Sequence, residues 1–300
     1  MVELSAVYAG PVERDAPLAE LTNFRLGGPG EWLLAPRSHE EVGAVLAWVA
    51  AEGLPLTILG EGSNVLIRDG GIRGAVLRIG KALGGLRWEG DAAVCGAGLA
   101  SRSLARQAMD AGRGGFEWAA ALPGSLGGAV AGNAGCFGGQ MADCFQALRG
   151  WTREARLLAL ARGELDFGYR RSSLPEGAVI TELTLRLPPL NAEERRQSEA
   201  RYREVLAKRA GTQPEGRNTA GSTFKNPPGD WAGRLIEACG LKGRRVGGAA
   251  VSERHANFIV TDRSGARARD VERLIEIIEA EVERQTGIRL EREIRIYGQA

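Results

Sequence analysis

Apolar and polar residues alternate along the chain at two different periods, which predicts a mixture of helices and strands. The stretch SHEEVGAVLAWVAA begins at Ser38, and Glu41 three residues later completes the pattern of a capping box. The apolar residues that follow recur at the spacing of one helix face: Val42, Val45, Leu46 and Val49. This pattern predicts an amphipathic helix that starts at Ser38 and ends near Gly53.

Short apolar runs bounded by glycine predict strands before and after a second helix in the sequence. Runs at 56–59, 65–67 and 74–79 predict that the chain opens in a β-α-β-turn-β order. The run AAVCG leads through a glycine turn into a helix expected from Ser101 to about Ala111. Further short strands are expected in CFQALRGW, ARLLAL and AVITELTLRL, the last of which ends at Pro188.

Helical periodicity dominates the last third of the chain. The strongly polar stretch 192–210 predicts a helix with few apolar contacts, and a shorter helix is expected at 231–239. The segment 271–285 is strongly amphipathic, with apolar residues at positions 271, 274, 275, 278 and 282. Strands are expected at 258–260 and in the final alternating sequence IRLEREIRIYG.

One segment, WAAALPGSLGGAVAGNAGCFGGQMA, runs from Trp118 to Ala142 without a charged residue. Its length alone would cross a bilayer, but seven glycines together with proline, asparagine and glutamine are poor material for a membrane helix. Glycine allows close backbone approach without side-chain bulk. The segment therefore suits a loop wrapped against a pyrophosphate or a flat ring, or one packed tightly between strands.

Composition places the protein among ordinary globular chains. Apolar residues make up 44% and charged residues 25%, and 300 residues allow one large domain or two to three smaller ones. The formal charge of +2 gives no sign of a surface for nucleic acid or a membrane. The first residues lack the basic and apolar regions of a signal peptide, so a cytoplasmic location is expected.

The four cysteines form no metal-binding or disulfide pattern. Cys95, Cys136, Cys144 and Cys239 include no CxxC pair, and the chain has only two histidines to accompany them. We therefore expect free thiols and no metal site. His255 in SERHANFIV is expected to cap or pack rather than to bind a metal.

Four loops carry candidate chemistry, and each has a structural alternative. LGEGSNVLI (59–67) exposes backbone N–H groups that could hold phosphate, yet Val65 replaces the third glycine of a dinucleotide fingerprint, so an ordinary turn is the alternative. In FGYRRSSL, Arg170 could grip a carboxylate or phosphate, or form a surface ion pair.

The other two loops offer a hydroxyl and carboxylates. AGSTFKNP is expected to be an exposed turn that presents Ser222, and no Ser-His-Asp arrangement supports a nucleophile. Ser222 would therefore act as a proton or hydrogen-bond donor, unless it only caps the turn. Glu291 and Glu293 fall on the polar side of the last alternating segment, where surface carboxylates are the alternative.

Taken in order, seven motifs resemble the family of UDP-N-acetylenolpyruvoylglucosamine reductases, the flavoenzymes of early peptidoglycan synthesis. The motifs are TNFRLGG (22–28), LGEGSNVLI (59–67), LPGSLGGAVAGNAG (122–135), YRRSSL (169–174), GSTFKNP (221–227), AGRLIEACGLKGRRVGGAAVSERHANFIV (232–260) and LEREIRIYG (290–298). The resemblance runs nearly end to end, and no single motif decides it.

The resemblance implies an α+β architecture. It consists of a two-subdomain FAD-binding fold of the vanillyl-alcohol-oxidase type and a C-terminal α+β substrate-binding domain. The expected boundaries are 1–83 for the first FAD subdomain, 84–208 for the second and 209–286 for the substrate domain. A terminal strand within 287–300 would return to the first subdomain.

The resemblance also implies that FAD binds non-covalently, with its pyrophosphate against the turn at 60–64 and the loop at 123–135. The cofactor-binding residues would be Leu59, Gly60, Glu61, Gly62, Ser63, Asn64, Pro123, Gly124, Ser125, Gly128, Asn133, Ala134, Gly135 and Ile180. NADPH would be the co-substrate.

The family's three catalytic positions match Arg170, Ser222 and Glu293. NADPH would give a hydride to flavin N5, and the reduced flavin would pass it to the vinyl carbon of the enolpyruvyl ether of UDP-N-acetylglucosamine. Arg170 would stabilise charge on the carboxylate, Ser222 would protonate the α carbon, and Glu293 would orient or polarise this region. Three further residues match positions that hold the UDP-sugar: Tyr169, Lys225 and Asn226.

The chain differs from some members of this family in one region, and two alternative functions remain compatible with its sequence. The span from Arg186 to Ala220 contains a charged helix and a short loop, so the chain is similar to the shorter subtype without a tyrosine-bearing closing loop. One rival is an oxidase on the same flavin scaffold, with FAD attached covalently through Cys95, Cys136 or His39. The other is a nucleotide-binding module without turnover.

Overall fold

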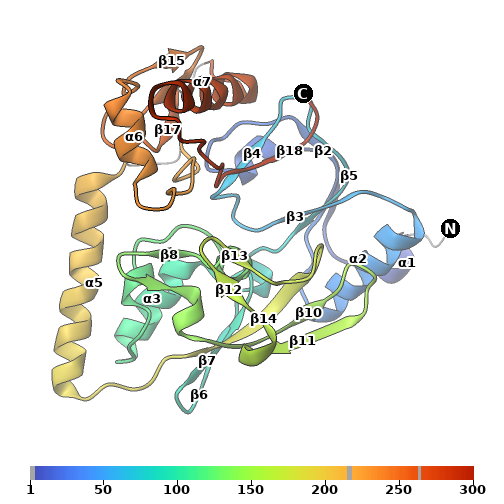
Figure 1. The fold of residues 1–300 in the computed structure, drawn as a ribbon. Helices are drawn as coiled ribbons and strands as arrows, with labels where there is room; N and C mark the ends of the chain where they lie inside the picture. The colour runs from blue at the N-terminus through green and yellow to red at the C-terminus, as the bar shows by residue number, and fades with distance from the viewer. Residues whose placement is uncertain (1–3, 215–217, 263–264) are drawn as a thin grey trace. The chain divides into compact units, whose positions relative to one another are not determined.

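The protein is described by a computed structural model that covers residues 4–214, 218–262 and 265–300 (Figure 1). The chain forms two compact units, each assembled from segments that are far apart in the sequence. Unit 1 contains Met1–Glu13, Trp32–Glu61 and Gly74–Arg209, and unit 2 contains Arg14–Glu31, Gly62–Arg73 and Ala210–Ala300. The finer division at residues 83 and 208 stays a prediction.

A five-stranded antiparallel sheet is the centre of unit 1 (Figure 1). Its strands, in spatial order, are β11 (Leu157–Ala161), β10 (Phe145–Trp151), β14 (Val179–Arg186), β7 (Ala92–Gly96) and β6 (Leu86–Glu89). Four of the five match strands expected from the sequence. The exception, β6, has only four residues with alternating exposure, which is too short for its period to be recognised.

Helix α2 (His39–Ala51) confirms the first helix prediction and packs into the core of unit 1. Its apolar stripe is buried as expected, at Val42, Val45, Leu46 and Val49. Ser38 is the N-cap, and its Oγ accepts the N–H of Glu41 at 3.2 Å. The capping box is altered, however, because the Glu41 carboxylate accepts the N–H of Arg37 at 2.7 Å.

The long uncharged segment contains a short helix that the sequence did not indicate. Helix α4 (Leu126–Ala131) buries Leu126, Ala129 and Val130 and packs on β14 and β7, while α3 (Ser101–Asp110) starts as expected. Adjacent glycines lower helix propensity by about 1 kcal/mol each, so burial of this apolar face outweighs the local preference. In the described part of the chain, no helix is long and apolar enough to span a membrane.

A second sheet has four strands in the order β1 (Val12–Pro17), β2 (Pro29–Leu34), β5 (Ile72–Arg78) and β3 (Leu56–Leu59). Strands β3 and β5 are parallel, with Leu59 opposite Arg78, and both were expected. Strands β1 and β2 were not, because β1 reads VERDAP with a single buried residue and shows no apolar alternation.

Unit 2 combines a small antiparallel sheet with two helices. The sheet order is β15 (Arg245–Val246), β16 (Ala249–Val251) and β17 (Ile259–Thr261), beside α6 (Ala232–Ala238) and α7 (Ala268–Thr286). Asp69 caps α7, since its carboxylate accepts the N–H groups of Ala268 and Arg269 at 3.0 and 3.2 Å. The predicted apolar stripe of α7 lies in the core of this unit.

The C-terminal segment returns to residues near position 65. Strand β18 (Arg295–Tyr297) pairs in parallel with β4 (Val65–Ile67). The strand is shorter than expected, because residues before it form single bridges and backbone hydrogen bonds to other segments instead of a regular ladder.

The long helix α5 (Ala192–Thr212) follows strand β14 in the sequence and is drawn in yellow in Figure 1. Its few buried positions include Tyr202 and Val205, which belong to the core of unit 1. The tyrosine in this span is therefore a packing residue and does not lie on a loop. Residues 215–217, which belong to the loop predicted from the sequence, lie outside the described residues.

Candidate active site

The segment Ser222–Lys225 lies between two other stretches of unit 2. Ser222 forms an isolated antiparallel bridge with Phe258, and Phe224 forms one with Arg292. The expectation of an exposed turn was wrong, because Thr223 and Phe224 are 3% and 1% exposed. Buried backbone groups must be paired, which explains why this segment bonds on both edges.

Two of the three predicted catalytic residues come together here. The carbonyl oxygen of Thr223, the residue after Ser222, accepts the N–H groups of Glu293 and Ile294 at 2.9 and 3.3 Å. The side chain of Asn64 donates to the carbonyl oxygen of Glu293 at 3.1 Å. Ser222, Glu293 and Asn64 are thus held by direct bonds between segments that are distant in the sequence.

The predicted substrate-binding residues Lys225 and Asn226 already have partners within unit 2. Lys225 forms an ion pair with Glu291, whose side chain is 73% exposed, and its N–H donates to the carbonyl oxygen of Glu291 at 2.8 Å. The Asn226 Oδ1 accepts the N–H of Ala232 at the start of α6. Glu291 therefore neutralises a lysine, whereas Glu293 lies beside the serine segment.

Two residues of this region were not predicted to have a role here. Asn257 is 4% exposed and forms two hydrogen bonds with Phe224 through its side chain. The signal for it was a polar residue inside the apolar run ANFIV. His255 accepts the N–H of Asn257 at Nδ1, and burial lowers the pKa of its ring, so it is a packed neutral histidine as expected.

Arg170 lies at the tip of a two-residue hairpin in unit 1. Strands β12 (Phe167–Gly168) and β13 (Arg171–Ser172) pair, and Tyr169 and Arg170 form the turn between them. Arg170 has a φ of 56°, a conformation that costs a non-glycine residue about 1–2 kcal/mol. Its guanidinium carbon lies 5.1 Å from the centre of the Tyr169 ring, which is 52% exposed.

This hairpin is anchored to the loop that was predicted to hold FAD. Asn133, at φ 40°, donates through Nδ2 to the carbonyl oxygen of Gly168 at 3.0 Å. The same amide group donates to Gln140 Oε1, and Oδ1 accepts the N–H of Ala142. Since Asn133 is 2% exposed, its side chain positions the arginine hairpin instead of facing outward.

The two turns predicted to hold the FAD pyrophosphate meet inside unit 1. A Cβ atom placed on Gly60, directly after β3, would lie 2.5 Å from the Oγ of Ser125 at the start of α4. A side chain at position 60 would therefore force the Ser125 hydroxyl to another rotamer. This narrow junction of two glycine turns fits a dinucleotide that must lie close to the backbone, and residues of both turns would hold it.

The other predicted cofactor residues are distributed as follows. Leu59 ends β3 and is buried, Glu61 is the last residue of its segment of unit 1, and Gly62, Ser63 and Asn64 open a segment of unit 2. Pro123 and Gly124 precede α4, Gly128 lies within it, Ala134 and Gly135 follow it, and Ile180 lies in β14.

The turn after β3 requires glycine at position 62. Gly62 has a φ of 63°, and a Cβ atom there would lie 2.1 Å from the carbonyl oxygen of Leu21.

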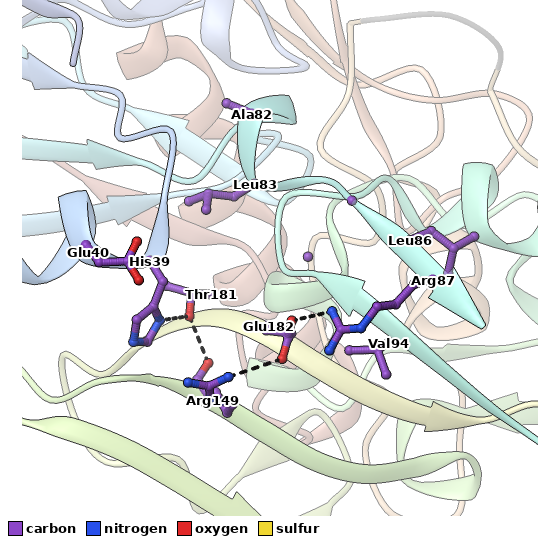
Figure 2. A pocket seen from close by; sticks show the side chains of 12 residues that line it. His39, Glu40, Ala82, Leu83, Leu86, Arg87, Val94, Arg149, Thr181 and Glu182 are labelled. Carbon is purple, nitrogen blue, oxygen red and sulfur yellow. Dashed lines mark hydrogen bonds and ion pairs between the residues drawn. The ribbon is translucent and has the colours of Figure 1, made fainter. Parts of the chain in front are cut away.

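A cavity of about 430 Å³ opens in unit 1, and no predicted catalytic or cofactor residue lines it (Figure 2). Thr181 donates to the carbonyl oxygen of Arg149 at 3.2 Å and therefore accepts from His39 Nδ1 at 2.7 Å. His39 also lies against the ring of Trp151. Glu182, the next residue of β14, also lines the cavity and pairs with Arg87 and Arg149 (Figure 2).

The four cysteines of the chain differ in burial, and burial sets their reactivity. Burial raises the pKa of Cys95 and Cys144 to about 12 and that of Cys136 to about 11, although Arg209 and Arg170 lower the pKa of Cys136. All four are free thiols. Within the ranges that the structure describes, no group of histidine, cysteine or acidic residues could hold a metal ion.

Comparisons with known proteins agree with this architecture. Residues 31–161 match a family model described as FAD binding domain. Residues 213–297 match one described as UDP-N-acetylenolpyruvoylglucosamine reductase, C-terminal domain. The two matches together cover most of the chain and confirm the predicted order of an FAD-binding region before a C-terminal domain.

Relatives match nearly the whole chain. The UDP-N-acetylenolpyruvoylglucosamine reductase of Anaeromyxobacter sp. (strain Fw109-5) is 45% identical over 297 residues, which cover 99% of this chain and 92% of that protein. The protein named UDP-N-acetylenolpyruvoylglucosamine reductase 2 of Symbiobacterium thermophilum is 41% identical, with coverage of 96% and 93%.

Solved structures give the same result. The crystal structure of the reductase from Thermus caldophilus superposes with a TM-score of 0.82 at 36% identity, covering 96% of this chain and all of that one. The 6-hydroxy-D-nicotine oxidase from Arthrobacter nicotinovorans, with a TM-score of 0.58 at 13% identity over 97% of this chain and 90% of that one, shares the fold alone. The chain is an FAD-dependent oxidoreductase that belongs to the UDP-N-acetylenolpyruvoylglucosamine reductase family.

Proposed function

We propose that the protein reduces the enolpyruvyl ether of UDP-N-acetylglucosamine to UDP-N-acetylmuramate, with NADPH as the hydride source. The proposal places the reaction in cytoplasmic peptidoglycan precursor synthesis. The observation that carries it is the direct pairing of the Ser222 and Glu293 segments through the carbonyl oxygen of Thr223 in a member of this reductase family.

The chemistry assigns each of the three catalytic residues a separate task. FAD, when bound, would supply the hydride that reduces the terminal vinyl carbon of the substrate, with NADPH as its source. Addition of the hydride leaves an electron pair on the α carbon, which delocalises onto the neighbouring carboxylate. Arg170 stabilises that developing charge, because guanidinium stays protonated and forms two parallel hydrogen bonds with a carboxylate.

Ser222 completes the reduction by giving its hydroxyl proton to the α carbon. A serine hydroxyl is a weak acid, but a carbanion-like carbon is basic enough to accept its proton. Glu293 polarises or orients the serine region.

The remaining contacts follow from the same proposal. Residues 59–64, residues 123–135 and Ile180 would hold FAD without a covalent bond. In this proposal Lys225, Asn226 and Tyr169 contact the UDP-sugar. Residues 209–286 form the substrate domain.

An anaerobic titration of the flavin spectrum tests the proposal. The flavin absorbance should be bleached by NADPH and restored by the enolpyruvyl sugar nucleotide, with UDP-N-acetylmuramate as the product. A flavin that NADPH bleaches but that this substrate leaves reduced would rule out the proposed reaction. UDP-N-acetylglucosamine, which lacks the enolpyruvyl group, is the control.

A further inference from the structure

The side chain of Asn257 lies in the core of unit 2 and bonds to the backbone of one distant residue. Its Oδ1 accepts the N–H of Phe224 at 3.0 Å, and its Nδ2 donates to the carbonyl oxygen of the same residue at 2.8 Å. Asn257 is 4% exposed and Phe224 1%. A carboxamide offers the same donor and acceptor as a peptide group, so this side chain acts as the backbone of a neighbouring strand would.

The main chain of the same region extends this contact toward the serine. The carbonyl oxygen of Asn257 accepts the N–H of Thr223 at 2.8 Å, and Phe258 bridges Ser222. On the opposite edge, Thr223 and Lys225 bond to the segment that carries Glu293. The stretch from Ser222 to Lys225 is therefore fixed on two edges, and Asn257 provides the bonds of one of them.

His255 in turn fixes Asn257. Its Nδ1 accepts the N–H of Asn257 at 3.3 Å, which requires an unprotonated Nδ1. Burial lowers the pKa of the ring, so the neutral form persists at neutral pH. The ring also packs against Phe258, at 4.7 Å between centres, which holds the loop between them in one arrangement.

We propose that Asn257 is a positioning residue for the proton-transfer step, an inference that rests on the proposed function. Without its carboxamide, the buried N–H and carbonyl groups of Phe224 lose their partners, which destabilises this arrangement of the chain. The chain would shift to recover them, and the hydroxyl of Ser222 would move with it. A displacement of about 1 Å from a reacting atom can slow a step about 100-fold.

Replacement of the amide by a carboxyl group gives the sharpest test. In Asn257→Asp, the protonated carboxyl still donates to the carbonyl of Phe224 and accepts its N–H, whereas the ionised carboxylate only accepts and repels that carbonyl. Reoxidation of reduced flavin by the enolpyruvyl nucleotide should therefore recover in the variant as pH falls through the carboxyl pKa, which burial raises. Wild type, measured in parallel by stopped flow, should lack this rise.

Asn257→Leu, of similar volume but without hydrogen bonds, should slow reoxidation about 100-fold at every pH. Flavin reduction by NADPH should change less than about threefold in both variants, since that step does not use Ser222. Ile278→Val is the stability control, because it removes a buried methyl from the same core on α7. It should lower the melting temperature without a change in either step.

The outcomes separate this inference from the proposed function. If the nucleotide does not reoxidise the reduced flavin of the wild type, both the proposed function and the role of Asn257 are overturned. If the wild type turns over and Asn257→Asp has the same pH profile of reoxidation as the wild type, only the role of Asn257 is overturned. Because the Asp comparison is made within one folded variant across pH, poor folding of Asn257→Leu does not affect it.

Discussion

The backbone N–H of Glu293 donates a hydrogen bond to the carbonyl oxygen of Thr223 over 2.9 Å. This bond joins the C-terminal segment to the residue that follows Ser222. The hydroxyl of Ser222 and the carboxylate of Glu293, which are far apart in the sequence, thus belong to segments whose backbones are hydrogen-bonded to each other. Their separation is set by paired main chains rather than by mobile loops, which suits a proton transfer that depends on geometry.

If Ser222 is the proton donor, the Ser222→Ala variant should lose the rate of flavin reoxidation selectively. Flavin reduction by NADPH should remain near the wild-type rate, while reoxidation by the enolpyruvyl nucleotide should fall by about 10²–10⁴, the usual contribution of a positioned acid. Stopped-flow absorbance separates the two steps. Ser222→Cys, which keeps a transferable proton, should retain part of the rate, and equal losses in both steps would remove Ser222 from this role.

The hairpin geometry of Arg170 predicts that charge alone will not replace it. Arg170→Lys keeps a cation but loses the planar fork, so reoxidation should still fall by about 10²–10³, as for the loss of one charge-stabilising donor. The neighbouring Arg171, on β13, provides the control variant Arg171→Lys, which should leave turnover near wild type. Steady-state kinetics with both variants would decide this, and a fully active Arg170→Lys would contradict the proposed role.

The contact between Gly60 and Ser125 predicts coupled effects of two substitutions. Gly60→Ala should lower the free energy of unfolding by about 0.5–1.5 kcal/mol, because its methyl group would force the Ser125 hydroxyl out of its present rotamer. In a Ser125→Ala background the loss should be smaller, since the clashing oxygen is gone. Urea unfolding of the four proteins measures this coupling.

Gly163→Ala is the matched control for this pair, because no atom lies within 4 Å of a Cβ built there. It should leave stability nearly unchanged. Additive losses in the double variant would show that Gly60 and Ser125 do not approach as described.

The neutral state of His255 predicts a pH-dependent stability. Burial holds its folded pKa below the ordinary value of 6.5, so the unfolded chain binds the proton first as pH falls. The contribution of His255 to the free energy of unfolding should therefore decline below about pH 6.5 and level off below the folded pKa. Chemical unfolding at several pH values should show this decline, and His255→Gln should be flatter over the same range.

The buried thiols predict that FAD leaves the denatured chain. Cys95 is fully buried, and burial raises the pKa of Cys95 and Cys136 far above neutrality, so neither is a reactive thiolate. His39 is bonded to Thr181. After denaturation and ultrafiltration the yellow colour should appear in the filtrate. Colour that stays with the protein would instead support the covalent oxidase alternative.

The sequence by itself determined the elements whose signal is local. The apolar stripes of α2 and α7, the strands β10 and β14, and the cap at Ser38 are where the pattern predicted them, because each depends on residues a few positions apart. The family motifs in the sequence also indicated the class of cofactor. The sequence therefore identified the candidate residues, but it could not show how they are arranged in space.

The tertiary structure decided what depends on distant segments. Helix α4 forms despite its glycines because it packs on a sheet, and the serine segment is buried although its composition indicated an exposed turn. The only local signal for Asn257 was its polarity inside an apolar run, and its partner could not be predicted because Phe224 is 33 residues away and hydrogen bonds at that range leave no periodic trace. Local propensity determines whether a segment forms a helix or a strand. Burial, and the need to satisfy buried backbone groups, determine which distant segment it pairs with.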